Sequence, residues 1–122
     1  MVSFERALEI FRAENFYVYT VNNGKAALIY LPDKFGFDGR VTSIHSDCVF
    51  EENNNKIMFV KFKVNSKNYH PKIGFDWDEP IDLKEISADE FSTKVRNLMD
   101  SAILCYKQVH AAKKLNNVKK DF

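Results

Sequence analysis

The stretch that decides the fold is ISADEFSTKVRNLMDSAILCYKQVHAAKKL, residues 86–115. It opens with Ser87–Glu90 (SADE), a capping box in which serine and glutamate side chains satisfy free backbone N–H groups at a helix start. Ile86 and Phe91 flank this box as a hydrophobic staple. The pattern therefore predicts a helix that begins after Ser87 and runs to about Leu115.

Apolar side chains in this predicted helix recur at a strict 4,3 spacing, the heptad pattern of a packed seam: Phe91, Val95, Leu98, Ala102, Cys105, Val109 and Ala112. Further apolar residues lie beside the seam, and a helix that is apolar on several sides needs several packing partners. We expect one side to cover a sheet and another to contact a second copy of the chain. The predicted homodimer surface consists of Leu98, Met99, Ala102, Ile103 and Tyr106.

A second, shorter helix is predicted at the N-terminus, over about residues 3–14. Ser3 can cap it, Glu5 suits the positive end of the helix dipole, and Phe4, Leu8 and Phe11 recur at helical spacing. This apolar stripe indicates that the helix packs on the rest of the domain.

The best hairpin signal is Asn23-Gly24, between two β-rich runs of residues 16–21 and 26–31. An Asn-Gly pair supplies the two positive φ angles of a type I′ turn, and such a turn fixes the strand register. In that register Val21 faces Ala26, Tyr19 faces Leu28 and Tyr17 faces Tyr30. One face gathers the three tyrosines and the other is mainly aliphatic. We expect the long C-terminal helix to cover the tyrosine face, since both sheet faces need cover.

Three further strands complete the pattern. Residues 41–50 and 57–64 predict a second hairpin around a polar turn, and residues 72–77 predict a fifth strand with Ile73, Phe75 and Trp77 on one side. Strict alternation in the run 57–64 predicts a buried face with Met58, Val60, Phe62 and Val64, and a wet face with Phe59, Lys61 and Lys63.

Together these elements predict an α+β fold in the order α-β-β-β-β-β-α. We expect a mainly antiparallel sheet of about five strands, packed by a short N-terminal helix and a long C-terminal helix. The loop between residues 32 and 40 carries Phe35 and Phe37 beside Gly36. These rings either form an exposed contact for a partner or fold back onto the core, and folding back is the commoner arrangement.

A chain of 122 residues has the length of one domain, which we place over residues 1–115, with a basic tail over 116–122 that we expect to fray. Early charges interrupt any signal peptide, and no apolar run is long enough to span a membrane. We therefore predict a cytoplasmic protein with no membrane partner, in which Cys48 and Cys105 are buried free thiols. Abundant Lys, Asn and Phe are typical of an A/T-rich genome, such as that of a low-GC bacterium or its phage.

The net charge of +1 conceals a separation of charge along the chain. Residues 65–92 carry three basic and seven acidic side chains, whereas residues 93–122 carry seven basic and two acidic ones. A wholly basic nucleic-acid coat is excluded by this balance, but a local basic patch is not. Acidic and basic segments can also pair across a dimer.

Three groups of residues are candidates for a ligand site. Asp76, Asp78 and Glu79 offer oxygen ligands for Mg²⁺ or Ca²⁺, although their order is not that of an EF-hand loop. The tyrosine face can stack bases, and the basic helix end can meet phosphate. The residues of these last two groups are Tyr17, Tyr19, Tyr30, Lys107, Lys113 and Lys114.

The sequence favours a non-catalytic protein-interaction module of the adaptor or inhibitor type, because no motif fixes a catalytic chemistry and the helix and the Phe35/Phe37 loop offer surplus apolar surface. We expect another protein as partner and no cofactor. Two alternatives stay open: a binder of nucleotides or single-stranded nucleic acid through the tyrosine face or the basic helix, and a metal-dependent enzyme at Asp76 and Asp78.

Overall fold

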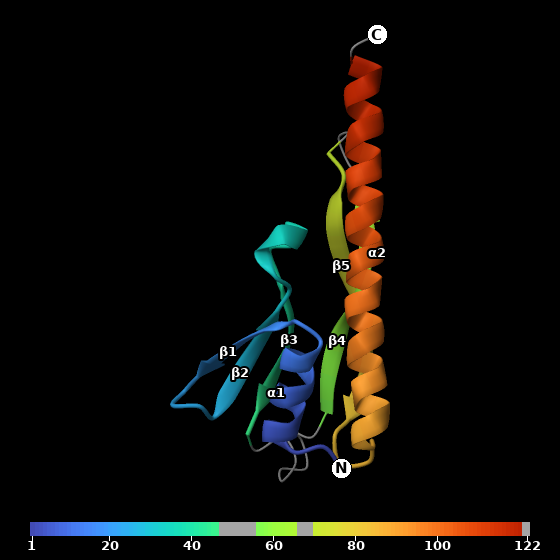
Figure 1. The fold of residues 1–122 in the computed structure, drawn as a ribbon. Helices are drawn as coiled ribbons and strands as arrows, with labels where there is room; N and C mark the ends of the chain where they lie inside the picture. Colours follow the sequence, from blue (N-terminus) through green and yellow to red (C-terminus); the bar gives the residue numbers. More distant parts are fainter. Residues whose placement is uncertain (47–55, 66–69, 121–122) are drawn as a thin grey trace.

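The computed structural model describes residues 1–46, 56–65 and 70–120 and has two helices, five strands and one 3₁₀ turn in that part of the chain. The elements follow the order α1 (Phe4–Ala13), β1 (Tyr17–Val21), β2 (Ala26–Tyr30), η1 (Asp33–Phe35), β3 (Arg40–His45), β4 (Lys56–Asn65), β5 (Lys72–Asp82) and α2 (Ala88–Lys120) (Figure 1). All strand pairs are antiparallel. The predicted α+β fold and its element order are confirmed.

The strands divide into two sheets, one with the order β1-β2-β3 and one with β4 and β5. The sequence predicts a single sheet in which residues 41–50 pair with residues 57–64. Over the described residues, β3 pairs with β2 instead and β4 pairs with β5. Residues 47–55, which include Cys48 and the predicted turn, lie outside the described residues.

The first hairpin has the predicted register, since Val21 pairs with Ala26 and Tyr17 pairs with Tyr30. Its turn has φ angles of 58° at Asn23 and 83° in the following glycine, as a type I′ turn requires. Asn23 and Gly24 therefore set the strand register, because they fix the number of residues in the turn.

Burial along β4 switches from one face of the strand to the other beside a bulge in β5. Asp78 and Glu79 of β5 stand opposite the single residue Phe59 of β4. Phe59 is buried at 5% exposure and Met58 is exposed at 39%, so the predicted assignment of these two residues is wrong. The neighbours Phe59 and Val60 are both buried, so strict alternation fails there, whereas from Val60 onward the predicted burial pattern is confirmed.

The core centres on Phe11 of α1, which has no exposed surface. Its ring makes edge-to-face contacts with Phe16 before β1, Phe59 of β4 and Phe91 of α2, with ring centroids 5.6, 5.7 and 5.8 Å apart. Phe59 and Phe91 also contact each other, at 6.0 Å. This cluster joins both helices to a strand of the second sheet and to the start of the first.

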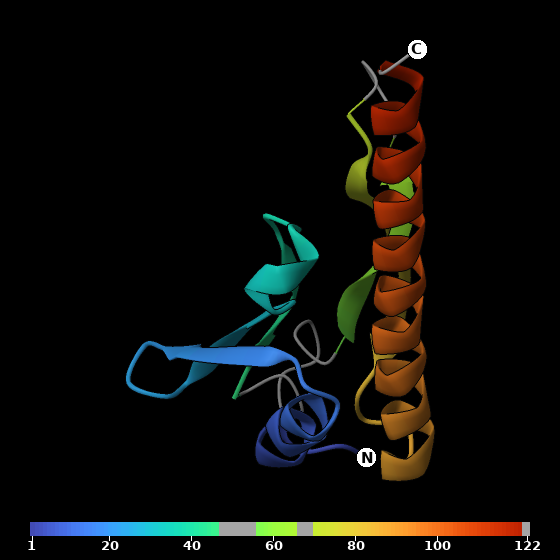
Figure 2. The ribbon, with the colours of Figure 1, turned by 45° about the horizontal axis from the view of Figure 1, so that its top comes forward.

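Helix α2 buries the predicted heptad seam along its length. Phe91, Val95, Leu98, Ala102, Cys105 and Val109 are all buried. The helix continues to Lys120, beyond the predicted end at about Leu115, and its C-terminal part extends past the strands in both ribbon views (Figures 1 and 2). No helix in the described part of the chain combines the length and apolar content needed to cross a membrane.

We predict that Phe11→Ala lowers the free energy of unfolding by about 3–5 kcal/mol, because it removes a fully buried ring and leaves a cavity among three others. Urea denaturation followed by far-UV circular dichroism measures this change. The control is Tyr19→Ala, where the side chain is exposed and we expect a change within about 0.5 kcal/mol. A loss below about 1 kcal/mol in Phe11→Ala would show that the cluster is not the centre of the core.

Candidate functional site

The tyrosine face of the first sheet is exposed. Tyr17 and Tyr19 retain 60% and 52% of their accessible surface, so the expectation that the long helix covers this face is wrong. The reason is that α2 contacts β4 and β5, while α1 contacts β1 and the aliphatic face of the first sheet is turned to the core. The β1–β2 hairpin points away from α2 (Figure 1).

Strand pairing places the cationic side chain of Arg40 in one cross-strand row with Tyr17 and Tyr30. Tyr17 pairs with Tyr30 of β2, and Tyr30 pairs with Arg40 of β3, where a bulge shifts the register by one residue. Tyr19 lies on the same face, two residues along β1 from Tyr17. The outer face of the first sheet thus ends, at its β3 side, in the exposed Arg40.

A groove between the two sheets continues this face. A cavity of about 450 Å³ is lined by Tyr30, Asp38, Gly39, Arg40, Phe75 and Trp77. A cavity of about 200 Å³ adjoins it and is lined by Arg40, Thr42, Ser43, His45, Lys56, Ile57, Met58 and Trp77. Because Arg40 and Trp77 line both cavities, the two form one groove that separates β3 from the second sheet.

Trp77 stands exposed at this groove and is supported from behind by other rings. It retains 51% of its surface and contacts Phe75 edge to face at 5.5 Å. Phe75 in turn contacts Phe37 at 5.6 Å, and Phe37 contacts the buried Phe62 at 5.3 Å. A row of rings therefore runs from the core to the surface, which holds the indole in place.

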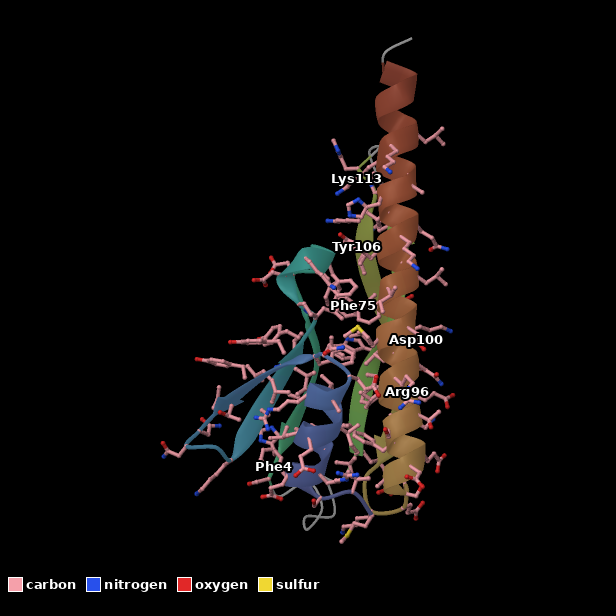
Figure 3. The ribbon with its side chains drawn as sticks, viewed as in Figure 1. Phe4, Phe75, Arg96, Asp100, Tyr106 and Lys113 are labelled. Atoms are coloured by element: carbon pink, nitrogen blue, oxygen red, sulfur yellow. The ribbon has the colours of Figure 1, made fainter. Side chains whose placement is uncertain are left out.

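The two loop phenylalanines fold back onto the protein. Phe35 is buried and contacts Tyr106 of α2 at 5.3 Å, and Phe37 packs against the core while supporting Phe75. Figure 3 labels Tyr106 and Phe75 near η1 and β5. The interpretation that Phe35 offers an exposed contact is therefore wrong. Phe37 contributes to the surface only by supporting the ring of Phe75.

Most of the predicted dimer residues of α2 pack inside the protein's own fold. Leu98, Met99 and Ala102 are buried against the chain's own core, and Tyr106 is partly buried there. Only Ile103 of this set is exposed, at 38%. The helix buries its heptad seam from Phe91 to Val109 in the protein's own core, so this set of residues does not form a free face.

The three candidate lysines Lys107, Lys113 and Lys114 are exposed on α2. Lys113 is labelled toward the far end of α2 in Figure 3, away from the β1–β2 hairpin. The structure therefore does not bring the basic helix end together with the tyrosine face.

The acidic candidates lie on the exposed part of β5. The carboxylate of Asp76 accepts hydrogen bonds from Nζ of Lys63 at 3.1 and 3.2 Å, and Asp78 accepts one from the backbone N–H of Glu79 at 2.8 Å. Within residues 1–46, 56–65 and 70–120, no group of three or more His, Cys, Asp or Glu side chains is placed to hold a metal ion. Asp76 is instead part of a cross-strand ion pair with Lys63.

The buried thiol of Cys105 lacks the exposure and the lowered pKa that a cysteine nucleophile needs. It is free, it is 6% exposed, and burial raises the pKa of its thiol above the ordinary value. Reactive cysteines have a lowered pKa and partial exposure. The geometry favours a packing role for this side chain.

Protein-family models, curated protein sequences and solved structures show no match to this chain. The physical character of its exposed surface is therefore what indicates its function. Sequence reasoning placed Phe75 and Trp77 on one side of a strand but missed that they emerge beside Arg40. One signal for this was available: the single tryptophan of the chain lies in an otherwise acidic run of residues.

We predict that the stability of the protein falls as pH rises past the ordinary thiol pKa of 9.0. The unfolded chain loses the Cys105 proton first, so deprotonation favours the unfolded state until pH exceeds the raised pKa of the folded thiol. Urea denaturation across this pH range in a Cys48→Ser background measures the effect. Cys105→Ala in the same background is the control, and an equal pH dependence in both would contradict the prediction.

Proposed function

We propose that the protein is a non-catalytic interaction module that binds another protein through one aromatic surface. This surface consists of Tyr17, Tyr19, Phe75 and Trp77, with Arg40 between them. The observation that carries the proposal is that Tyr30 of the first sheet lines one groove with Phe75 and Trp77 of the second, while Tyr17 and Tyr19 are exposed on the same sheet face as Tyr30. Exposed apolar surface of this kind is costly unless a partner covers it.

The residue types favour a protein as the partner. Tryptophan, tyrosine and arginine dominate the binding energy of protein interfaces, and the two aromatic residues give a large contact area with only two side-chain torsions to fix. Trp77 is already held by Phe75 and Phe37, so less side-chain entropy is lost when a partner covers it. Arg40 adds a fixed donor for a carboxylate or a backbone carbonyl.

The floor of the groove adds a polar group. Thr42, which is 3% exposed, lines the groove. Ser43, on the outer face, also lines the groove. A groove that offers aromatic area and a small number of polar groups is suited to specific contact with a partner protein.

Single-stranded nucleic acid fits the surface less well than a protein does. Such binders interleave cations with their stacking rings, so that phosphates are neutralised along the strand. On the tyrosine face the row through Tyr17 ends in Arg40, while the row through Tyr19 continues to Leu28 and Ser43 and has no cation. One arginine beside three tyrosines gives too little positive charge to track a phosphate backbone.

The test uses the full-length protein as bait in an extract of its native host, followed by a one-to-one titration with the captured partner. The single tryptophan makes Trp77 fluorescence a direct readout of this surface. We expect the emission to change on binding and Trp77→Ala, followed by calorimetry, to weaken affinity roughly 30-fold, since truncation of a central anchor costs about 2 kcal/mol. Tyr17→Ala/Tyr19→Ala is expected to weaken it less.

The matched control is Leu115→Ala, an apolar side chain of similar exposure on the C-terminal part of α2. It is expected to leave the one-to-one affinity unchanged. A partner that binds Trp77→Ala as tightly as the wild-type protein would refute this surface. Salt-dependent quenching of Trp77 by a mixed-sequence single-stranded oligonucleotide, abolished in Arg40→Gln, would replace the proposal with nucleic-acid binding.

A further inference from the structure

The groove at Trp77 runs along the edge of β3 rather than across one face of its sheet. Thr42 from the aliphatic face and Ser43 from the tyrosine face both line the part of about 200 Å³. Neighbouring side chains of a strand point to opposite faces, so a cavity that both of them line passes the edge of the strand. Among the described residues β3 pairs with β2 alone, and this edge is therefore open.

The second sheet forms the opposite wall of this part of the groove. Lys56, Ile57 and Met58 are consecutive residues of β4 and all line it, so an edge of β4 faces it as well. Strand β4 lies beside β3 but, within the described part of the chain, pairs with β5 only. Open strand edges present N–H and C=O groups that an extended chain can pair. The backbone around the groove is therefore suited to an extended segment.

The charged side chains at these edges are mainly cationic. Arg40 and Lys56, both exposed, line the 200 Å³ part together with His45, and no acidic side chain of the described residues does so. Asp38, the acidic residue of the lining, belongs to the adjoining part of about 450 Å³. Of the ion pairs formed within residues 1–46, 56–65 and 70–120, none includes Arg40 or Lys56. Charge complementarity at this end of the groove therefore favours an acidic partner.

We propose that the partner of the aromatic surface inserts an extended acidic segment into this groove, an inference that rests on the proposed function. The segment pairs with the open edge of β3 and adds a fourth strand to the first sheet. Its carboxylates bind Arg40, whose planar guanidinium matches a carboxylate, and Lys56. An apolar side chain of the segment packs on Trp77, which lines both parts of the groove.

The other large groove of the molecule has the opposite charge. It has a volume of about 560 Å³ and lies between α2 and the β4–β5 pair. Two lysines, Lys61 and Lys94, line it against five acidic residues: Asp78, Glu79, Asp82, Glu85 and Glu90. An acidic segment is repelled there, so the charges of the two grooves direct it to Trp77.

The test selects peptides from a random phage-displayed library on the full-length protein and discards those that also bind Trp77→Ala. We expect the selected peptides to contain more aspartate and glutamate than lysine and arginine, together with an apolar residue. A selected peptide without tryptophan is then titrated, and the fluorescence of Trp77, the single tryptophan of the protein, reports binding. Arg40→Gln and Lys56→Gln are each expected to weaken its affinity roughly tenfold, since each removes a charge-assisted contact.

The matched control is Lys25→Gln, which removes an exposed cation at the hairpin turn, outside the lining of the groove. It is expected to leave the affinity unchanged. Arg40→Glu is expected to reject the acidic peptide and to bind a version in which lysine replaces its acidic residues. Selected peptides that are neutral or basic, or an acidic peptide that binds both glutamine variants as tightly as the wild-type protein, would overturn the inference.

The extended conformation has its own test, which is N-methylation of single backbone amides of the peptide. A segment paired along one strand edge points every second N–H at that edge, so we expect methylation to abolish binding at alternate positions. Equal tolerance at every position would exclude strand pairing. A single-stranded oligonucleotide that binds more tightly than every selected peptide would assign the cations to phosphate instead. A dimer in light scattering that Trp77→Ala converts to monomer would make a second copy the occupant.

Failure of this inference and failure of the proposed function give different results. A host partner that is lost in Trp77→Ala but binds Arg40→Gln and Lys56→Gln as tightly as the wild-type protein would support the aromatic surface and overturn the acidic segment. A host partner that binds Trp77→Ala as tightly as the wild-type protein would overturn both.

Discussion

The edge-to-face packing of Phe11 against Phe16, Phe59 and Phe91 is the interaction on which the rest of the structure depends. The two-stranded sheet is too small to be stable alone, and the three-stranded sheet needs its apolar face covered. The phenylalanine cluster joins them through the two helices. Since α1 occupies the inner side of the first sheet at this cluster, α2 is left to the second sheet, and the tyrosines of the first sheet face outward.

This division of the two helices explains where the surfaces lie. Helix α2 packs its heptad seam on the protein's own core and keeps a second, weaker stripe exposed. The first sheet turns its aliphatic face inward and its tyrosines outward, toward the groove at Trp77.

Local signals in the sequence predicted the elements well, and the pairing between them less well. The SADE capping box, the Asn23-Gly24 turn and the heptad seam each depend on a few neighbouring residues, and each is confirmed. The split into two sheets and the exposure of the tyrosines depend on which helix reaches which face. The face that each helix covers is set by contacts between residues far apart in the sequence, such as Phe11 and Phe91. The periodicity of the sequence does not reveal these contacts. The groove at Trp77 was missed for the same reason.

The bulge that sets Asp78 and Glu79 opposite Phe59 has a consequence for how this protein can vary. Their side chains are exposed, so their chemical identity is weakly constrained. Their number is not free, because removing one residue shifts the register of β5 by one on one side of the bulge and turns side chains there, such as Ile81, to the other face of the sheet. Related chains that keep this fold are expected to accept many substitutions at these two positions but no deletion. At this point of the chain, the fold constrains length more tightly than composition.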